Sequence, residues 1–88
     1  MLIIKPVLEN KPEAEIAVNA ARAPFFLIFN DQDFVKSIKN PFVSGWGAWF
    51  AAADLLKNEW CELFIAKKIW DNMKNRLGEL WINYKLIK

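Results

Sequence analysis

The chain has 88 residues, of which 55% are hydrophobic and 25% charged, with only three glycines and four prolines. This composition excludes a disordered or collagen-like chain, and the length predicts one small domain over residues 1–88. Twelve Lys and Arg against ten Asp and Glu give a net charge of +2. That excess is too small for the basic face that carries most non-specific nucleic-acid affinity, so we expect no nucleic-acid partner.

The rarest residue types restrict the chemistry further. The chain has no His and one cysteine, Cys61, so it can form no internal disulfide, no Cys/His zinc site and no Ser-His-Asp or Cys-His catalytic arrangement. We therefore expect a non-enzymatic protein in a reducing, cytoplasmic compartment. The longest apolar stretch, residues 42–56, is interrupted by two glycines and Asp54, so no membrane span is expected.

The first half of the chain predicts strands and one short helix. The apolar, β-branched pattern of strands occurs at residues 2–8, 25–29 and 34–39. The second of these runs is continuously apolar, as in a central strand covered on both faces, and turn residues 30–33 join it in a hairpin to the third, an edge strand. Pro12 can open a short helix that ends near residue 21, before Pro24.

The second half alternates helical and strand patterns. A helical stripe after residue 47 comprises Trp49, Ala52, Ala53, Leu56 and Trp60. Residues 61–67 predict a buried strand, and residues 81–87 predict a last strand. Between them Asp71 or Asn72 can cap a helix whose apolar face comprises Ile69, Met73, Leu77 and Leu80. The order strand, short helix, strand, strand, helix, strand, helix, strand is that of an α/β fold with a five-stranded mixed sheet.

Several stretches carry a family resemblance. They are Val7-Leu8-Glu9-Asn10-Lys11, Arg22-Ala23-Pro24-Phe25-Phe26-Leu27-Ile28, Asn40-Pro41-Phe42-Val43-Ser44-Gly45-Trp46-Gly47-Ala48 and Leu63-Phe64-Ile65-Ala66-Lys67-Lys68-Ile69. In these stretches and their order the chain resembles the dinitrogenase iron–molybdenum cofactor biosynthesis domain family. The resemblance implies a ribonuclease H-like, three-layer α/β/α fold and a role in binding or carrying an iron–molybdenum cluster or its precursor. It also implies a ligand crevice between residues 19–22, the Gly45-Trp46-Gly47 loop and Lys68, so that the candidate binding residues are Asn19, Arg22, Gly45, Trp46, Gly47 and Lys68.

The chain departs from the family pattern where that chemistry would lie. Asn19 stands in the segment where the family has a histidine, and an amide is a poor ligand for iron or molybdenum. Larger residues stand where the pattern has glycines, namely Trp46, Trp49, Lys67, Trp70 and Trp81. Bulky rings at such positions would fill the space that a ligand needs. We therefore expect cluster binding to be weakened or lost, with no metal ligand to name.

Some residues admit more than one interpretation. Cys61 opens a buried strand, which favours a core cysteine over a thiolate ligand. The tryptophans could stack on a ligand, but the positions of Trp49, Trp60 and Trp81 favour core or interface packing and leave Trp46 as the exposed candidate. The basic stretch of Lys67, Lys68, Lys74 and Arg76 could hold a small anion near Lys68 or form a solvated helix face.

The sequence also bears on other functions. A nuclease is disfavoured, because the strands lack the converging acids that would hold two metal ions. The family pattern continues past the last strand, and a thin layer there would favour association with a second copy of the chain. The alternative function is thus a protein-interaction or self-associating structural module that uses exposed aromatic residues. A third interpretation is a designed or altered family member with no function of its own.

Overall fold

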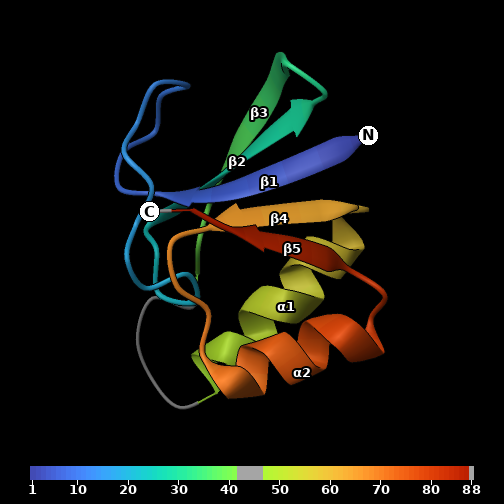
Figure 1. The fold of residues 1–88 in the computed structure, drawn as a ribbon. Helices are drawn as coiled ribbons and strands as arrows, with labels where there is room; N and C mark the ends of the chain where they lie inside the picture. Colours follow the sequence, from blue (N-terminus) through green and yellow to red (C-terminus); the bar gives the residue numbers. More distant parts are fainter. Residues whose placement is uncertain (42–46, 88) are drawn as a thin grey trace.

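The computed structural model describes residues 1–41 and 47–87, which form a mixed sheet with two helices (Figure 1). The elements are β1 (Leu2–Val7), β2 (Phe25–Asn30), β3 (Asp33–Lys39), α1 (Ala48–Asn58), β4 (Leu63–Ala66), α2 (Asp71–Glu79) and β5 (Asn83–Leu86). The sheet order is β3-β2-β1-β4-β5. β1 pairs antiparallel with β2, β2 pairs antiparallel with β3, and β1, β4 and β5 run parallel. The predicted α/β class and the five-stranded mixed sheet are confirmed.

β1 lies at the centre of the sheet, a place that the apolar pattern had predicted for residues 25–29. β2 is second in the order and is buried on successive residues Phe26, Leu27 and Ile28, so both of its faces are covered as expected. β1 takes the centre because β2 returns antiparallel along one side of it and β4 arrives parallel along the other. The predicted hairpin and the edge position of β3 are confirmed.

Both helices pack on the same face of the sheet (Figure 1). The core between helices and sheet includes Ile4, Phe26, Phe64, Leu56, Met73 and Leu77, all at most 1% exposed. The crossovers from β3 to β4 and from β4 to β5 advance in the same direction across the sheet, so crossovers of one hand put both helices on one face. Within the described residues the fold therefore has two layers, and the three-layer expectation is corrected.

The short helix predicted over residues 12–21 does not form. The segment between β1 and β2 is a series of turns that folds back onto the end of β1 through an antiparallel bridge between Val7 and Ile16. Leu8 N–H donates to the Glu15 carbonyl at 3.0 Å, and Ala17 N–H donates to the Pro6 carbonyl at 2.9 Å. A helix this short is marginal on its own, so these tertiary backbone hydrogen bonds outweigh its weak propensity. Ala17 and Ala21, two of the alanines that suggested the helix, are buried against the core instead.

Both helices end before the tryptophans that follow them. Trp60 and Trp81 come one residue after the C-caps of α1 and α2, each with a left-handed backbone at φ 62°. This conformation disfavours any residue with a side chain by about 1–2 kcal/mol. The two indoles are 78% and 89% exposed, so neither packs in the core, and of the two predicted alternatives only interface packing is left. Neither helix of the described residues is long and apolar enough to cross a membrane.

Candidate functional site

A pocket of about 330 Å³ lies where three separate segments meet. Its walls are Asn19, Ala21, Arg22, Ala48, Trp49, Trp70 and Asn72. These residues come from the turns before β2, from the first turn of α1 and from the start of α2. The volume is at the small end of ligand pockets, so the site suits a small ligand. The pocket lies beyond the carboxyl ends of β1 and β4, the place where open α/β sheets bind ligands.

Two helices begin at this pocket. α1 follows Gly47, whose left-handed φ of 77° suits glycine, although an added Cβ would meet no atom within 4 Å. α2 follows Trp70, an extended N-cap residue, and no described side chain forms a capping hydrogen bond at either helix. The first N–H groups of a helix have no partner within it, and its N-terminus carries a partial positive charge. Both helices therefore favour negative charge at this end. The first turn of α2 already carries the Asp71 carboxylate, whereas the first turn of α1 has no acidic residue.

Cationic side chains accompany these helix ends. Arg22 lines the pocket, and the Lys68 ammonium lies 4.1 Å from the centre of the Trp70 ring. This cation–π contact holds the ammonium beside the α2 N-terminus. Two other cations of the basic stretch are engaged elsewhere, since Lys67 pairs with Glu15 at 3.3 Å and Arg76 pairs with Asp54 at 2.9 Å. The interpretation as a solvated helix face is therefore wrong for Arg76.

The polar wall of the pocket also holds a buried acceptor without a partner. The Oδ1 atom of Asn19 is buried and accepts no hydrogen bond from the described residues. An unsatisfied buried acceptor costs about 1–3 kcal/mol, so a ligand that carries a hydrogen-bond donor would gain by meeting it. A fully deprotonated oxyanion has no such donor, so it would meet the Asn19 acceptor through a bridging water molecule.

The structure brings most of the predicted site residues together. Asn19 and Arg22 line the pocket, Gly47 directly precedes α1, and Lys68 lies on the ring of a lining residue. Gly45 and Trp46 lie outside the described residues.

The expectation about the bulky rings needs correction. Trp49 and Trp70, at two of the family glycine positions, stand as walls of the pocket and do not fill it. Trp70 is 56% exposed, and so Trp46 was not the sole candidate for an exposed ring. Sequence reasoning missed Ala48 as a lining residue and assigned Asn72 to a capping role, whereas the α2 N-cap is Trp70. The sequence signal that could have identified Ala48 and Asn72 as lining residues is their position at the start of the two predicted helices.

The donor set of the pocket does not fit direct metal coordination. Its side chains are amides, a guanidinium, indoles and methyl groups. No group of three or more His, Cys, Asp or Glu side chains in the described part of the chain is placed to hold a metal ion. Cys61 precedes β4, at the other end of that strand, where it is 6% exposed and packs in the core as predicted. Burial raises the pKa of its thiol to about 12, which keeps it protonated and a poor ligand near neutral pH.

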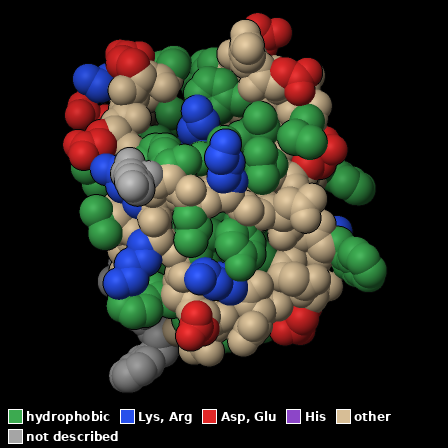
Figure 2. Space-filling model, in the orientation of Figure 1, with side chains coloured by type: hydrophobic (Ala, Val, Ile, Leu, Met, Phe, Trp, Pro, Cys, Tyr) green, Lys and Arg blue, Asp and Glu red, His purple; other side chains and the backbone are tan. Residues whose placement is uncertain are grey.

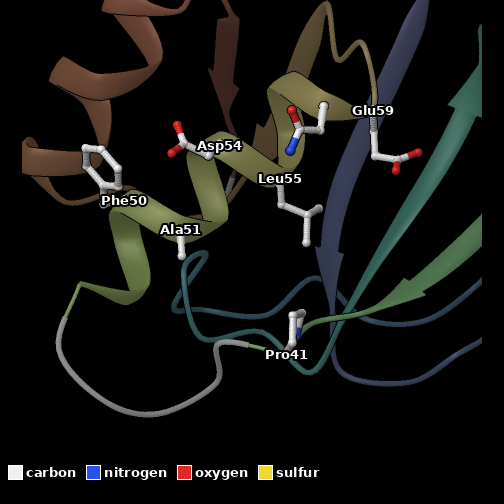
Figure 3. Close-up of a pocket in the computed structure, with 7 residues that line it drawn as sticks. Pro41, Phe50, Ala51, Asp54, Leu55 and Glu59 are labelled. Carbon is white, nitrogen blue, oxygen red and sulfur yellow. The ribbon is translucent and has the colours of Figure 1, made fainter.

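A second pocket, of about 470 Å³, lies along the other side of α1 (Figure 3). Ala51 and Leu55 of α1 point toward Pro41, and Phe50 lines the pocket from the same helix. Its acidic lining residues are already paired, Asp54 with Arg76 at 2.9 Å and Glu59 with Lys36 at 3.0 Å. This pocket is larger, but its acidic groups are already engaged and none of the predicted site residues lies in it. The smaller pocket is the better functional candidate.

The fold and the pocket define a small α/β domain, and comparison with solved structures finds the same fold. The apo form of the orange protein from Desulfovibrio gigas superposes with a TM-score of 0.86 at 14% identity, over 94% of this chain and 72% of that one. The NMR structure of a putative NifB protein from Thermotoga, of the DUF35 family, superposes with a TM-score of 0.82 at 16% identity, over 99% and 76%. No family model and no curated protein matches the sequence. At these identities the likeness shows a shared fold alone.

Proposed function

We propose that this chain is a non-enzymatic, carrier-type domain that holds a small anionic inorganic species in the pocket at the two helix N-termini. The observation that carries the proposal is the meeting, at one small pocket lined by Arg22, of two helix starts that no described side chain caps. Lys68, held on the Trp70 ring, adds positive charge beside it. Preorganised dipoles and cations of this kind bind oxyanions without further chemistry.

The resemblance to the iron–molybdenum cofactor family supports the choice of cargo. The proposal includes a ribonuclease H-like fold and membership of that family. It also includes a cytoplasmic location, in which Cys61 is reduced. The likeness in fold to the orange protein and to a putative NifB protein gives further support. Because the pocket offers no thiolate or imidazole, the cargo it suits is one whose metal already has its full set of ligands. We propose outer-sphere binding of molybdate or a similar anion, with affinity for a bare cluster weakened.

Titration with molybdate tests the anion site directly. Trp49 and Trp70 line the pocket, so intrinsic fluorescence should change with saturation as molybdate binds. Arg22→Gln and Lys68→Gln should each weaken binding about tenfold, the effect of losing one charge-assisted contact of about 1.4 kcal/mol. Lys11→Gln is the matched control, because Lys11 pairs with Glu9 in the turns beyond β1 and does not line the pocket. Equal loss in the control would show general charge attraction and contradict the site.

Anaerobic incubation with iron, sulfide and molybdate separates the two modes of binding. We expect no stoichiometric cluster to survive gel filtration, since the pocket has no ligand to replace those a cluster would need. Metal analysis and visible absorbance of the eluted protein measure the outcome. A retained cluster that is insensitive to Arg22→Gln would overturn outer-sphere binding in this pocket.

A further inference from the structure

The sheet has a second face, which points away from both helices. Ile4, Phe26 and Phe64 pack in the core between the sheet and the helices. Because successive residues of a strand point to opposite faces, the strand neighbours of these three residues point away from the helices. These neighbours, with the residues level with them on β3 and β5, form the open sheet face, which neither helix of the described residues covers. Parallel strands such as β1, β4 and β5 are usually covered on both faces, so this face is suited to a further contact.

A row of apolar side chains, the apolar row, crosses the open sheet face. Phe34 of β3 lies opposite Phe29 of β2, and Phe29 lies opposite Ile3 of β1. Ile3 is in turn level with Leu63 of β4. The rings of Phe29 and Phe34 meet edge to face, with their centroids 5.6 Å apart. Phe34 is 42% exposed and the other three residues are half-buried, so the row presents a continuous apolar surface over four strands, the kind of patch that marks an interaction site.

Three lysines stand beside the apolar row on the same face. Lys5 belongs to β1, and its ammonium lies 4.8 Å from the centre of the Phe29 ring. Lys39 of β3 and Lys85 of β5 lie level with open-face residues of β2 and β4, so they place a cation on each edge strand. None of the three ammonium groups forms an ion pair with a described residue. The face therefore combines apolar surface with positive charge that an outside group can meet.

The acidic side chains nearest to this face are engaged or point elsewhere. No strand position of the open sheet face holds Asp or Glu. Glu15 pairs with Lys67 at 3.3 Å, and Asp31 pairs with the N-terminal ammonium at 3.1 Å. Glu62 accepts a backbone hydrogen bond at 2.9 Å, and Asp33 directly precedes the apolar row on β3, so it points to the other face. In Figure 2, Lys or Arg side chains lie among hydrophobic ones over the middle of the view, and Asp and Glu side chains lie toward its edges. The complementary surface is therefore apolar and bordered by carboxylates.

A helix fits this face better than a second copy or a lipid surface does. A second copy laid face to face would bring the same lysines together, and like charges across an interface are unfavourable. The apolar row is mostly half-buried between its strands, whereas membrane anchors push their apolar side chains into the headgroup boundary. The edge strands β3 and β5 lie four strand spacings of about 4.8 Å apart, so a helix about 10–12 Å wide fits between their lysines.

We propose that the open sheet face binds an amphipathic helix of a partner protein. The apolar stripe of that helix covers the apolar row, and Asp or Glu side chains on both borders of the stripe meet Lys39 and Lys85. A helix packed on an apolar sheet face is the arrangement by which layered folds bury such a face. The contact is independent of the anion pocket, whose walls come from the turns before β2 and from the starts of the two helices.

The test uses a synthetic amphipathic helix with Leu along one face and Glu along both borders, and a counterpart with Lys in place of Glu. Isothermal titration calorimetry should show saturable binding of the Glu peptide and none of the Lys peptide. Lys39→Gln combined with Lys85→Gln should weaken binding of the Glu peptide about tenfold, because two charge contacts are lost. Lys57→Gln combined with Lys74→Gln is the matched control, since it removes the same charge from α1 and α2 on the other side of the sheet. Equal weakening in the two pairs would show general charge attraction and overturn the proposal.

A second pair of variants tests the apolar row. Phe34→Thr should weaken binding of the Glu peptide about tenfold, because the ring no longer becomes buried. Leu86→Thr should leave binding unchanged, since Leu86 is 44% exposed, close to the 42% of Phe34, but lies level with Ala66 on the helix side of the sheet. Urea denaturation of both variants checks that the fold is retained.

Three other results would overturn the proposal. One is unchanged binding of the Glu peptide to the Phe34→Thr variant. Another is self-association of the wild type in light scattering that Phe34→Thr abolishes, which would assign the face to a second copy. The third is binding of phosphatidylserine vesicles that the Lys39→Gln, Lys85→Gln variant loses, which would assign it to a lipid surface. Arg22→Gln should leave binding of the Glu peptide unchanged, which separates this result from the fate of the anion site.

Discussion

At the residue scale, Cys61 illustrates how position decides chemistry. Its thiol lies in the core between the sheet and the helices, with 6% of the residue exposed. Burial raises the pKa of the thiol from the ordinary 9.0 to about 12, and backbone hydrogen bonds with Ile4 and Leu63 offset the rise only in part. The sequence identified this residue as a core cysteine because it opens an apolar strand with no activating group nearby.

The raised pKa of Cys61 predicts both its reactivity and a pH dependence of stability. At pH 8 a thiol reagent should label the native protein far more slowly than the urea-unfolded chain. The native state holds the thiol proton more tightly, so its contribution to stability is complete below pH 9 and is lost as the pH rises from 9 toward 12. Urea denaturation of wild type and Cys61→Ala across this range isolates the effect. An identical decline in the two proteins would contradict this pKa.

At the element scale, Asn40 anchors the turns that carry the site. It follows β3 and is the one polar residue fully buried in the described part of the chain. Its side-chain amide donates to the Ala21 carbonyl at 3.0 Å and to the Ala23 carbonyl at 2.8 Å, on both sides of Arg22. Its backbone N–H also donates to the Pro24 carbonyl at 2.9 Å. Hydrogen bonds, and no helix, hold this part of the chain against the sheet.

Replacing Asn40 therefore tests how the turns are held. Asn40→Ala leaves two carbonyls without their donor and should lower the free energy of unfolding by about 1–3 kcal/mol, measured by urea denaturation. It should also weaken molybdate binding, because Arg22 loses the support on both sides. Asn40→Asp, of equal size but without the donors, should be no more stable than the alanine variant. Wild-type stability in both variants would show that the turns are held by apolar packing alone.

Strong periodic patterns made the main elements predictable. Continuous apolar runs located β2 and β4, and three- and four-residue spacing located α1 and α2. The prediction of a helix after Pro12 failed because alanines fit a helix face and a buried turn equally well. The prediction that Trp60 lies on the apolar helix face failed because this residue continues the helical spacing beyond the residue at which α1 ends. Whether a ring continues a buried stripe or points to solvent depends on the backbone of a single residue, which spacing does not reveal.

At the scale of the whole molecule, one arrangement produces the candidate site. The two helices run side by side from the same end of the sheet, so their N-termini meet at the pocket (Figure 1). The family resemblance was sufficient to bring Asn19, Arg22 and Lys68 together, but the indole walls came only from the structure. The size of the indole rings had suggested a filled crevice. The direction in which a side chain points at the start of a helix cannot be predicted from composition.

The most direct measurement of the central claim follows backbone amide resonances of isotopically labelled protein during titration with tungstate, a molybdate analogue. The account predicts that the amides of Ala48, Trp49, Asp71 and Asn72 shift together along one saturable curve, because these groups begin the two helices at the pocket. Arg22→Gln should move that curve to higher concentration. Shifts that are scattered over surface lysines and do not saturate, with these four amides unmoved, would contradict an anion site at the helix N-termini.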